Sequence, residues 1–459
     1  MLDINMEYYA IWKKALTLAW PIILNHVFVT AMRTTDMLLM GHFGPAAVTA
    51  VGLGDVWERI VLHVGLGLGT GSISLISQET GAARAGKEYN ANEILTQVLI
   101  TGALIGLPFI VIGVLIPDKM IQLLGAEREV ITTGAQYLMI IFAAAPFRIV
   151  TLIAARSLQG TGDTRTPMVV DIVTNVINIV LSVLLSLGLF FFPELGVLGV
   201  GIGTFVAKVS AGIIYIFIFI FISQNLGLEY PEQGWNFIIT RQLIRVSLPR
   251  SLQGGYQSLI TFPFNALVLT FGTEAAAAYH IGRRIQQQIM APLQRSYGTV
   301  TTIMTGQKLG EEKPEVSRHI TRSLVWLTII TIGSVGLILF ILAPQLVGLF
   351  SEDTAVINFG ISFLRTLSLG APILTVCHIY SGLLTSAGNT KTPFYGLVIN
   401  QTIFKLGLSS LLSLPLGFGI FGIFIGIIFD YIGQLIWVLR EFLSLNWVEQ
   451  AREMIDERQ

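Results

Sequence analysis

Long apolar blocks, separated by short polar stretches, recur along almost the entire chain. Each block has about 20 or more residues, enough to cross the ~30 Å hydrocarbon core of a bilayer as a helix. Because a helix satisfies its own backbone hydrogen bonds, the pattern predicts an all-α integral membrane protein. The twelve predicted transmembrane helices cover residues 15–40, 46–76, 92–116, 129–157, 166–190, 196–223, 243–271, 274–306, 319–347, 354–385, 391–414 and 418–444.

One polar turn between these blocks occurs twice. The segment Gly162-Asp163-Thr164-Arg165-Thr166-Pro167 returns in the second half of the chain as Gly388-Asn389-Thr390-Lys391-Thr392-Pro393. Other pairs follow at nearly the same offset, namely Pro21 and Pro249, Gly44 and Gly272, Gly54 and Gly282, Gln78 and Gln307, and Gly81 and Gly310. Matched features in this order indicate an internal duplication. We therefore expect two pseudo-symmetric six-helix lobes, in the same orientation, around a central cleft.

The repeat also sets the expected domain boundaries. Residues 1–223 form an N-lobe with helices one to six, and residues 243–444 form a C-lobe with helices seven to twelve. Residues 224–242 contain Pro and Gly and suit a cytoplasmic linker. Residues 445–459 form a cytoplasmic tail whose apolar and charged residues alternate at helical spacing, so we expect it to lie on the inner membrane surface.

Composition and charge exclude several function classes. The chain is 53% hydrophobic and 12% charged, has zero formal net charge and contains no basic run, which argues against nucleic acid as a partner. The single cysteine, Cys377, excludes an internal disulfide. No phosphate-binding loop or metal-ligand spacing is present, so we expect no cofactor and no bound metal.

The distribution of Lys and Arg predicts the orientation. Most of these residues fall in the loops on one side of the predicted helices, and cytoplasmic loops carry the excess of positive charge. We therefore expect a multi-pass protein of the inner or plasma membrane with both termini cytoplasmic. Its partners are then the lipid bilayer and a small-molecule substrate, and we expect a monomer.

At these residues the chain resembles the multidrug and toxic compound extrusion (MATE) family, prokaryotic type. The likeness rests on Asp36, eight residues before Gly44, on the two Gln/Gly loops and on the two Gly-x-Thr-x-Thr-Pro turns. It covers nearly the whole chain. The resemblance implies a non-enzymatic exporter of organic, often cationic compounds, driven by entry of protons or sodium ions.

The resemblance also implies an ion-coupling site in the first lobe. Asp36 matches the carboxylate of helix one, Asn178 an asparagine of helix five and Thr204 a threonine of helix six. Ser182 stands where the family pattern has a second acid. In the second lobe, Gln257 and Leu374 occupy the positions that the resemblance assigns to acids in sodium-coupled members. A single carboxylate provides a weak electric field for sodium, and this favours the proton as the coupling ion. Sodium stays the alternative.

Asp36 is a functional candidate because a carboxylate inside a bilayer is costly unless it meets water, a partner or a cavity. Arg33 lies three residues earlier, on the same side of the helix. Two interpretations follow: Asp36 exchanges the coupling ion, or Arg33 and Asp36 form a structural pair.

Other polar residues inside the predicted helices have two interpretations each. Asn175 and Asn178 share a face and suit either cavity lining or hydrogen bonding between helices. Arg148 lies about nine residues from a helix end, where it would contact an anionic substrate group or neutralise an internal carboxylate. Asp171 is interpreted as a surface carboxylate that reaches the interface. Further candidates for the cavity are Gln257, Gln287 and His63.

Helices two and eight carry opposite charges on corresponding segments, with Asp55 equivalent to Arg283 in the repeat. The first has Asp55 and Glu58, and the second has Arg283 and Arg284. Either the two sets meet across the cleft as an outer gate, or each set pairs within its own lobe. Lys208 and Asp430, near equivalent positions of helices six and twelve, are interpreted as structural polarity.

These observations favour a secondary antiporter that exports small amphiphilic compounds by alternating access. The nearest alternative is a flippase for lipid-linked sugars, because Arg148, Arg283 and Arg284 would suit an anionic headgroup. An intramembrane enzyme is disfavoured, since the histidines inside the predicted helices have no metal-ligand spacing. A structural or receptor role would leave the ionisable residues unexplained.

Overall fold

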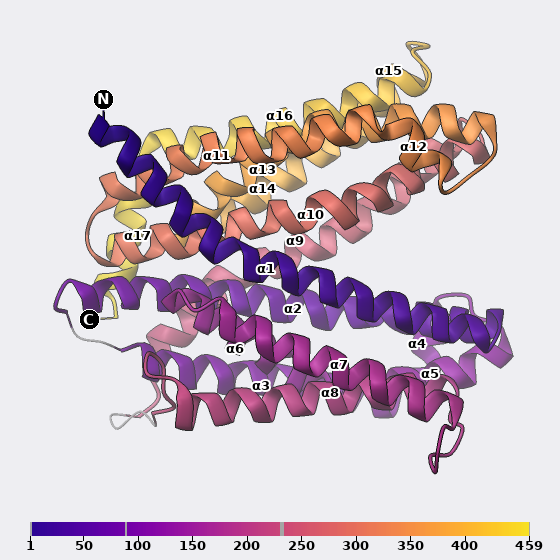
Figure 1. Cartoon of the computed structure of the whole chain (residues 1–459), viewed down its shortest axis with the longest axis horizontal. Coiled ribbons are helices and arrows are strands. Elements are labelled where there is room, and N and C mark those ends of the chain that lie inside the picture. The colour runs from indigo at the N-terminus through magenta and orange to yellow at the C-terminus, as the bar shows by residue number, and fades with distance from the viewer. Residues whose placement is uncertain (1, 88–89, 230–233, 459) are drawn as a thin grey trace. The chain divides into compact units, whose positions relative to one another are not determined.

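The computed structural model describes residues 2–87, 90–229 and 234–458, and its regular structure there is helical throughout (Figure 1). The first half contains α1 (Leu2–His42), α2 (Pro45–Arg84), α3 (Ala91–Leu115), α4 (Pro117–Leu123), α5 (Arg128–Ala143), α6 (Ala145–Thr161), α7 (Arg165–Leu187), α8 (Val197–Phe217) and the π-helix η1 (Ile218–Ile222). The second half contains α9 (Phe237–Leu269), α10 (Thr273–Gly310), α11 (Pro314–Ile341), α12 (Ala343–Gly348), α13 (Thr354–Ser386), α14 (Lys391–Asn400), the π-helix η2 (Gln401–Leu408), α15 (Ser409–Ser413), α16 (Ile420–Ser444) and α17 (Asn446–Asp456).

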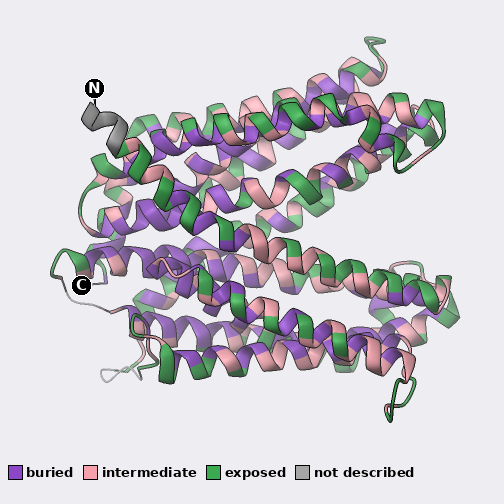
Figure 2. Ribbon diagram, viewed as in Figure 1, coloured by how far each residue is buried: buried purple, intermediate pink, exposed green. Residues whose placement is uncertain are grey.

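These helices follow the twelve predicted blocks closely. In the described ranges, eight helices are long and apolar enough to span a membrane, and the bent pair α5 and α6 adds a ninth. The other three passes are α9 and α10, which carry several arginines, and the run α14–η2–α15, which a π-helix divides. Large apolar side chains such as Leu38 and Phe262 remain 73% and 71% exposed along the helices (Figure 2). Such exposure is expected where lipid is the solvent.

The chain forms two compact units, and each includes a piece of the other half of the sequence. One unit comprises Leu24–Thr80 and Glu88–Ser251, and the other comprises Met1–Ile23, Gly81–Lys87 and Leu252–Gln459. This grouping differs from the boundaries expected from the repeat in where the first part of α1 and of α9 belongs. Residues 230–233 of the predicted linker lie outside the described residues, and its last residues are already helical, because α9 begins at Phe237.

The repeated turn ends one helix and starts the next. Gly162 and Gly388 have φ of +100° and +81°, a left-handed conformation that glycine adopts without strain at a helix C-terminus. Asp163 Oδ1 then accepts hydrogen bonds from the backbone N–H groups of Arg165 and Thr166, at 3.1 and 3.0 Å. Asn389 Oδ1 accepts from Thr392 N at 3.1 Å in the second copy. The repeat is therefore a helix C-cap joined to an N-cap.

Residues Gly81–Lys87, which follow Gln78 in the first Gln/Gly loop, lie against the second Gln/Gly loop inside one unit. Arg84 Nη1 donates to Gln307 Oε1 at 2.8 Å, and Lys87 Nζ lies 2.5 Å from Glu312 Oε1. Gly81 packs directly on the backbone of Gln307, where a side chain would collide. The hydrogen bond from Lys87 holds the pKa of Glu312 below its ordinary value.

This ion pair predicts a pH-dependent stability difference. Because the folded-state pKa of Glu312 is lowered, its stabilising effect is present above the unfolded pKa of about 4.3 and is lost as the pH falls through the folded value. Glu312→Gln should therefore lower the melting temperature at pH 7 and not at pH 3. The exposed Glu352→Gln is the control, and an equal effect of Glu312→Gln at both pH values would contradict the prediction.

The position of the tail on the inner membrane surface stays a prediction, but the structure shows what its apolar face contacts. Helix α17 buries Trp447, Ala451 and Met454 against α10, α13 and α16, with Trp447 fully inaccessible. Its apolar face is therefore covered by protein.

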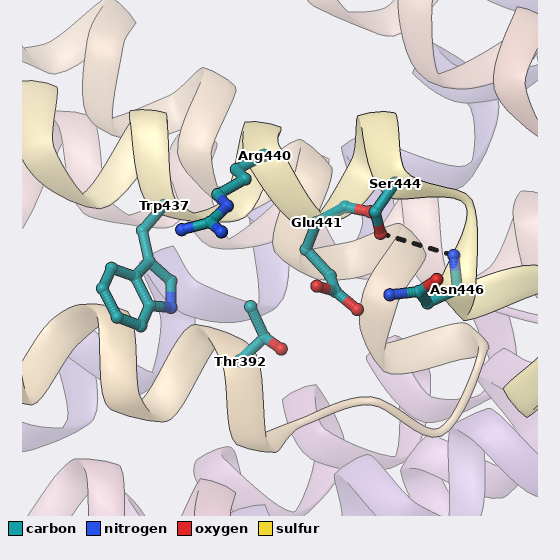
Figure 3. Close-up of a pocket in the computed structure, with 6 residues that line it drawn as sticks. All are labelled: Thr392, Trp437, Arg440, Glu441, Ser444 and Asn446. Atoms are coloured by element: carbon teal, nitrogen blue, oxygen red, sulfur yellow. Dashed lines mark hydrogen bonds between the residues drawn. The ribbon is translucent and has the colours of Figure 1, made fainter.

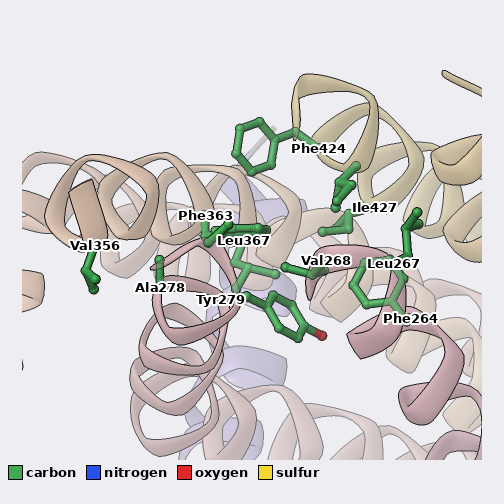
Figure 4. Close-up of a cluster of buried hydrophobic side chains, with 12 residues drawn as sticks. Phe264, Leu267, Val268, Ala278, Tyr279, Val356, Phe363, Leu367, Phe424 and Ile427 are labelled. Atoms are coloured by element: carbon green, nitrogen blue, oxygen red, sulfur yellow. The ribbon is translucent and has the colours of Figure 1, made fainter. Parts of the chain in front are cut away.

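A second core cluster of this unit joins α9, α10, α13 and α16 around Phe264, Tyr279 and Phe363 (Figure 4).

Candidate functional site

The predicted ion-site residues all lie in the first half, on α1, α7 and α8. Asp36 lies on α1 and is half-buried, and its Oδ1 is inaccessible and has no hydrogen-bond partner among the described residues. The Ser182 hydroxyl of α7 lies near enough to this carboxyl group to affect it. It forms no hydrogen bond of normal geometry, since Ser182 Oγ also has no partner among the described residues. The carboxylates of Asp55 and Glu58 and the guanidinium of Arg33 act on Asp36 electrostatically.

The structural Arg33–Asp36 pair does not form in this structure. Arg33 is exposed, and none of the ion pairs in the described part of the chain joins it to Asp36. The buried Oδ1 of Asp36 therefore remains available to a proton or a cation.

Asn178 and Thr204, two residues of the expected ion site, form a hydrogen bond. Asn178 Nδ2 donates to Thr204 Oγ1 at 3.0 Å, which joins α7 to α8. Asn178 Oδ1, Asn175 Nδ2, Ser182 Oγ and Ser186 Oγ are all buried without a partner in the described structure. Their spacing places them on one face of α7. Since unsatisfied buried polar atoms are costly, this face is suited to bind an ion or water.

Two glycines of α8 allow α7 to come close at this face. A Cβ added at Gly203 would lie 2.7 Å from Ser182 Oγ, and one at Gly199 would lie 2.7 Å from Ser186 Oγ. Only residues without a side chain permit such an approach. The glycines thus let Ser182 and Ser186 pack directly on α8.

We expect Gly203→Ala to destabilise the protein by about 1–3 kcal/mol, because the methyl group must displace the backbone of α7. Gly52→Ala is the matched control: a Cβ there meets no atom within 4 Å, so we expect no loss of stability. Thermal unfolding of the purified variants measures both effects. Equal melting temperatures for the two variants would show that Gly203 does not pack tightly on Ser182.

Tyr137 belongs to the same region, and sequence reasoning missed it. Its ring packs on Gly54, where a Cβ would lie 2.6 Å from it, and its hydroxyl donates to Asp55 Oδ1 at 3.5 Å. The Gly54/Gly282 match in the repeat indicated a close approach at this position, but nothing in the sequence identified the aromatic partner.

Arg148 forms an ion pair with Glu58 in the same unit. Its Nη1 lies 2.6 Å from Glu58 Oε1, and the two side chains are only 14% and 12% exposed. The structure thus favours the interpretation that Arg148 neutralises an internal carboxylate. For Glu58 it favours pairing within its own half. His63 lies half-buried on α2, two turns beyond Asp55.

Asp171 was interpreted as a surface carboxylate, and this was wrong. It is half-buried, accepts a hydrogen bond from Asn25 Nδ2 of α1 at 2.5 Å, and interacts with Lys208 of α8. The sequence did not show that α1 places the Asn25 side-chain amide next to Asp171.

The second-half candidates occupy more open positions. Gln257 on α9, and Gln287 and Arg284 on α10, are exposed. Arg283 is half-buried and interacts with Tyr431 of α16. A gate between Asp55 and the two arginines stays a prediction.

A pocket of about 270 Å³ lies in the second half, at the ends of α14 and α16 (Figure 3). Arg440 and Glu441 line it, with Trp437, Thr392 and the Ser444–Asn446 turn beside them. Glu441 Oε1 accepts from Asn389 Nδ2 at 3.2 Å, so the pocket adjoins the second copy of the repeated turn. None of the predicted site residues lines it.

The fold and the buried charges define a helical membrane protein made of two related halves. A family model, MatE, matches residues 21–184 and again 249–411, so its two matches begin at Pro21 and Pro249, a pair already identified in the sequence repeat. The chain belongs to this family, whose members are transporters and not enzymes. The predicted family and the predicted helical membrane architecture are confirmed.

Relatives match over nearly the whole chain. The probable multidrug resistance protein NorM of Thermotoga maritima is 26% identical over 460 residues, covering 98% of this chain and 97% of its own. The multidrug export protein MepA of Staphylococcus saprophyticus is 22% identical, covering 88% and 90%. Among solved structures, the outward-facing conformation of a multidrug resistance MATE family transporter of the MOP superfamily matches with a TM-score of 0.85 at 21% identity, covering 96% and 97%. This structural likeness establishes the fold.

Proposed function

We propose that this protein is a secondary antiporter that exports small amphiphilic organic cations in exchange for protons that bind at Asp36. The names of NorM and MepA as multidrug resistance and export proteins support the substrate class. The observation that carries the coupling is the buried Oδ1 of Asp36, which has no hydrogen-bond partner in the described part of the chain.

A proton fits this site better than a metal ion. Sodium needs several oxygen ligands, and none of the hydrogen bonds or ion pairs in the described residues assembles such a set around Asp36, since its Oδ1 is without a partner there. Protonation of one carboxylate needs no further ligand. The neutral acid would then donate a hydrogen bond to a buried acceptor, such as Ser182 Oγ.

Orientation and assembly are part of the same proposal. The excess of Lys and Arg in the loops on one side supports cytoplasmic termini in an inner or plasma membrane. The halves would alternate access to the two sides, with the protein acting as a monomer.

The alternative function, a flippase for lipid-linked sugars, depended on Arg148, Arg283 and Arg284. Pairing of Arg148 with Glu58 removes one of these charges from recognition of an anionic headgroup. The antiporter is therefore the better-supported function.

Transport of a fluorescent organic cation in proteoliposomes tests the proposal. Export should follow an imposed proton gradient and should not respond to a sodium gradient of equal size. Transport driven by a sodium gradient alone would show that sodium, and not the proton, is the coupling ion. Indifference to every cation, together with inhibition by a lipid-linked sugar, would favour the flippase.

A further inference from the structure

The polar pocket of the second half contains none of the residues of the proposed transport site. It measures about 270 Å³, and the residues that line it are Thr392, Trp437, Arg440, Glu441, Ser444 and Asn446 (Figure 3). Sites for drug-sized ligands usually measure about 300–1,000 Å³. Because the pocket lies just below this range, it suits a small polar headgroup better than a whole drug molecule.

The pocket lies where α16 reaches the membrane interface. The helix carries one charged residue, Asp430, before Arg440 and Glu441 follow in succession. The preceding residues, 420–439, form about 30 Å of helix, which is the thickness of the hydrocarbon core. Arg440 and Glu441 therefore come at the level of the lipid headgroups.

The two charged side chains of the pocket do not neutralise each other. None of the ion pairs within the described ranges involves Arg440 or Glu441, and consecutive helix residues do not face one another. Figure 3 shows the guanidinium on the side of Trp437 and the carboxylate on the side of Asn446. Glu441 Oε1 accepts from Asn389 Nδ2, which orients the carboxylate, while Oε2 accepts from no residue that the structure describes. The pocket thus presents a separate positive and negative group.

Apolar side chains lead from the membrane to this pocket. The Trp437 ring packs on α14, since a Cβ at Gly396 would lie 2.7 Å from its Cδ1, and it remains 38% exposed. Tryptophan is typical of the headgroup level. Phe429 and Ile436 are also exposed, and their spacing places them on the face of α16 that carries Arg440. Acyl chains can therefore lie along α16 below a headgroup in the pocket.

The first half has no polar group at the equivalent place. Gly203 of α8 corresponds to Gly426 of α16, because each packs on a serine of a neighbouring helix. At the same offset of 223 residues, Phe217 stands where α16 has Arg440, and the chain stays apolar as far as Ile222. The charged pocket is therefore a feature of the second half alone, and not a consequence of the duplicated fold.

The charges of the pocket match those of a zwitterionic phospholipid with a primary amine. A guanidinium binds phosphate oxygens through two parallel N–H bonds. A carboxylate accepts hydrogen bonds from a primary ammonium, whereas a trimethylated ammonium has no N–H to donate. The negative charge of Glu441 also disfavours lipids whose headgroup has a net negative charge.

We propose that this pocket binds the headgroup of phosphatidylethanolamine, with the phosphate on Arg440 and the ammonium on Glu441 Oε2. The acyl chains then lie along Phe429 and Ile436. This inference goes beyond the proposed function, because it concerns a bound lipid and not the exported compound. It holds whether or not Asp36 couples transport.

Native mass spectrometry of the purified protein, titrated with lipid, tests the site. Wild type should bind phosphatidylethanolamine about tenfold more tightly than phosphatidylcholine with the same acyl chains, since only the primary ammonium donates to Glu441. Glu441→Gln should abolish this preference, although its amide oxygen can still accept from Asn389. Arg440→Gln should weaken binding of both lipids about tenfold. Equal affinity of wild type for the two lipids, or unchanged binding by Arg440→Gln, would overturn the proposal.

Controls separate this pocket from other charged groups and from soluble ligands. Glu449→Gln and Arg452→Gln remove exposed charges of α17 outside the pocket and should bind lipid as wild type does. Glycerophosphoethanolamine, the same headgroup without acyl chains, should not displace the bound lipid at equal concentration. Displacement would assign the pocket to a soluble phosphate ester and contradict the lipid. The comparison of the two lipids on wild type stays decisive if a variant fails to fold.

Discussion

Asp36→Asn is expected to reduce gradient-driven export to the level of empty liposomes. The amide has nearly the shape of the carboxyl group but cannot take up and release a proton, and the buried Oδ1 has no other partner to replace that exchange. The measurement is transport of a fluorescent cation in proteoliposomes under an imposed proton gradient. Binding of the same compound to the purified variant, without a gradient, should persist.

Two variants define the Asp36 result. Asp118→Asn removes an exposed carboxylate on α4 and should leave transport unchanged. Asp36→Glu keeps an ionisable group and should retain part of the activity. Full gradient-driven transport by Asp36→Asn would remove this residue from the coupling role.

Arg148→Met is expected to destabilise the protein by about 3–5 kcal/mol, the cost of leaving a buried carboxylate without its partner. The estimate applies because both side chains of the Arg148–Glu58 pair are nearly inaccessible. Unfolding of the purified protein in denaturant measures the loss. The exposed Arg128→Met is the control for removal of a guanidinium.

The double variant Glu58→Gln/Arg148→Met distinguishes loss of charge compensation for Glu58 from loss of side-chain packing at Arg148. With both charges absent, no buried charge remains uncompensated, so much of the stability should return. If the double variant is as unstable as Arg148→Met, the loss comes from the missing side-chain volume and not from the charge of Glu58.

The sequence predicted helices and their ends better than contacts between them. Apolar blocks and the repeated Gly-x-Thr-x-Thr-Pro turn depend on neighbouring residues, so most predicted boundaries agree with the structure to within a few positions. The start of α9 was predicted six residues too late, because Arg241 and Gln242 separate Phe237-Ile238-Ile239 from the following apolar block. The division of the fourth pass into α5 and α6, bent by 45°, was also missed.

The candidate site could be predicted only in part. Asp36, Asn178, Ser182 and Thr204 followed from a family pattern, and the structure brings them together. The pairs Arg148–Glu58, Tyr137–Asp55 and Asn25–Asp171 join distant positions on different helices. Which residues meet there depends on helix rotation and on where glycines allow close packing, and neither is encoded in local spacing.

Helices α1 and α9 each leave one unit and enter the other, at Ile23 and at Ser251. Each of these positions comes two places after a proline of the repeat, Pro21 or Pro249, so the exchange is reciprocal and matches the duplication. During synthesis, the first unit stays incomplete until Ser251 has emerged, and the other requires the earliest-made segment of the chain. Either half expressed alone would therefore lack a helical segment that its own packing uses.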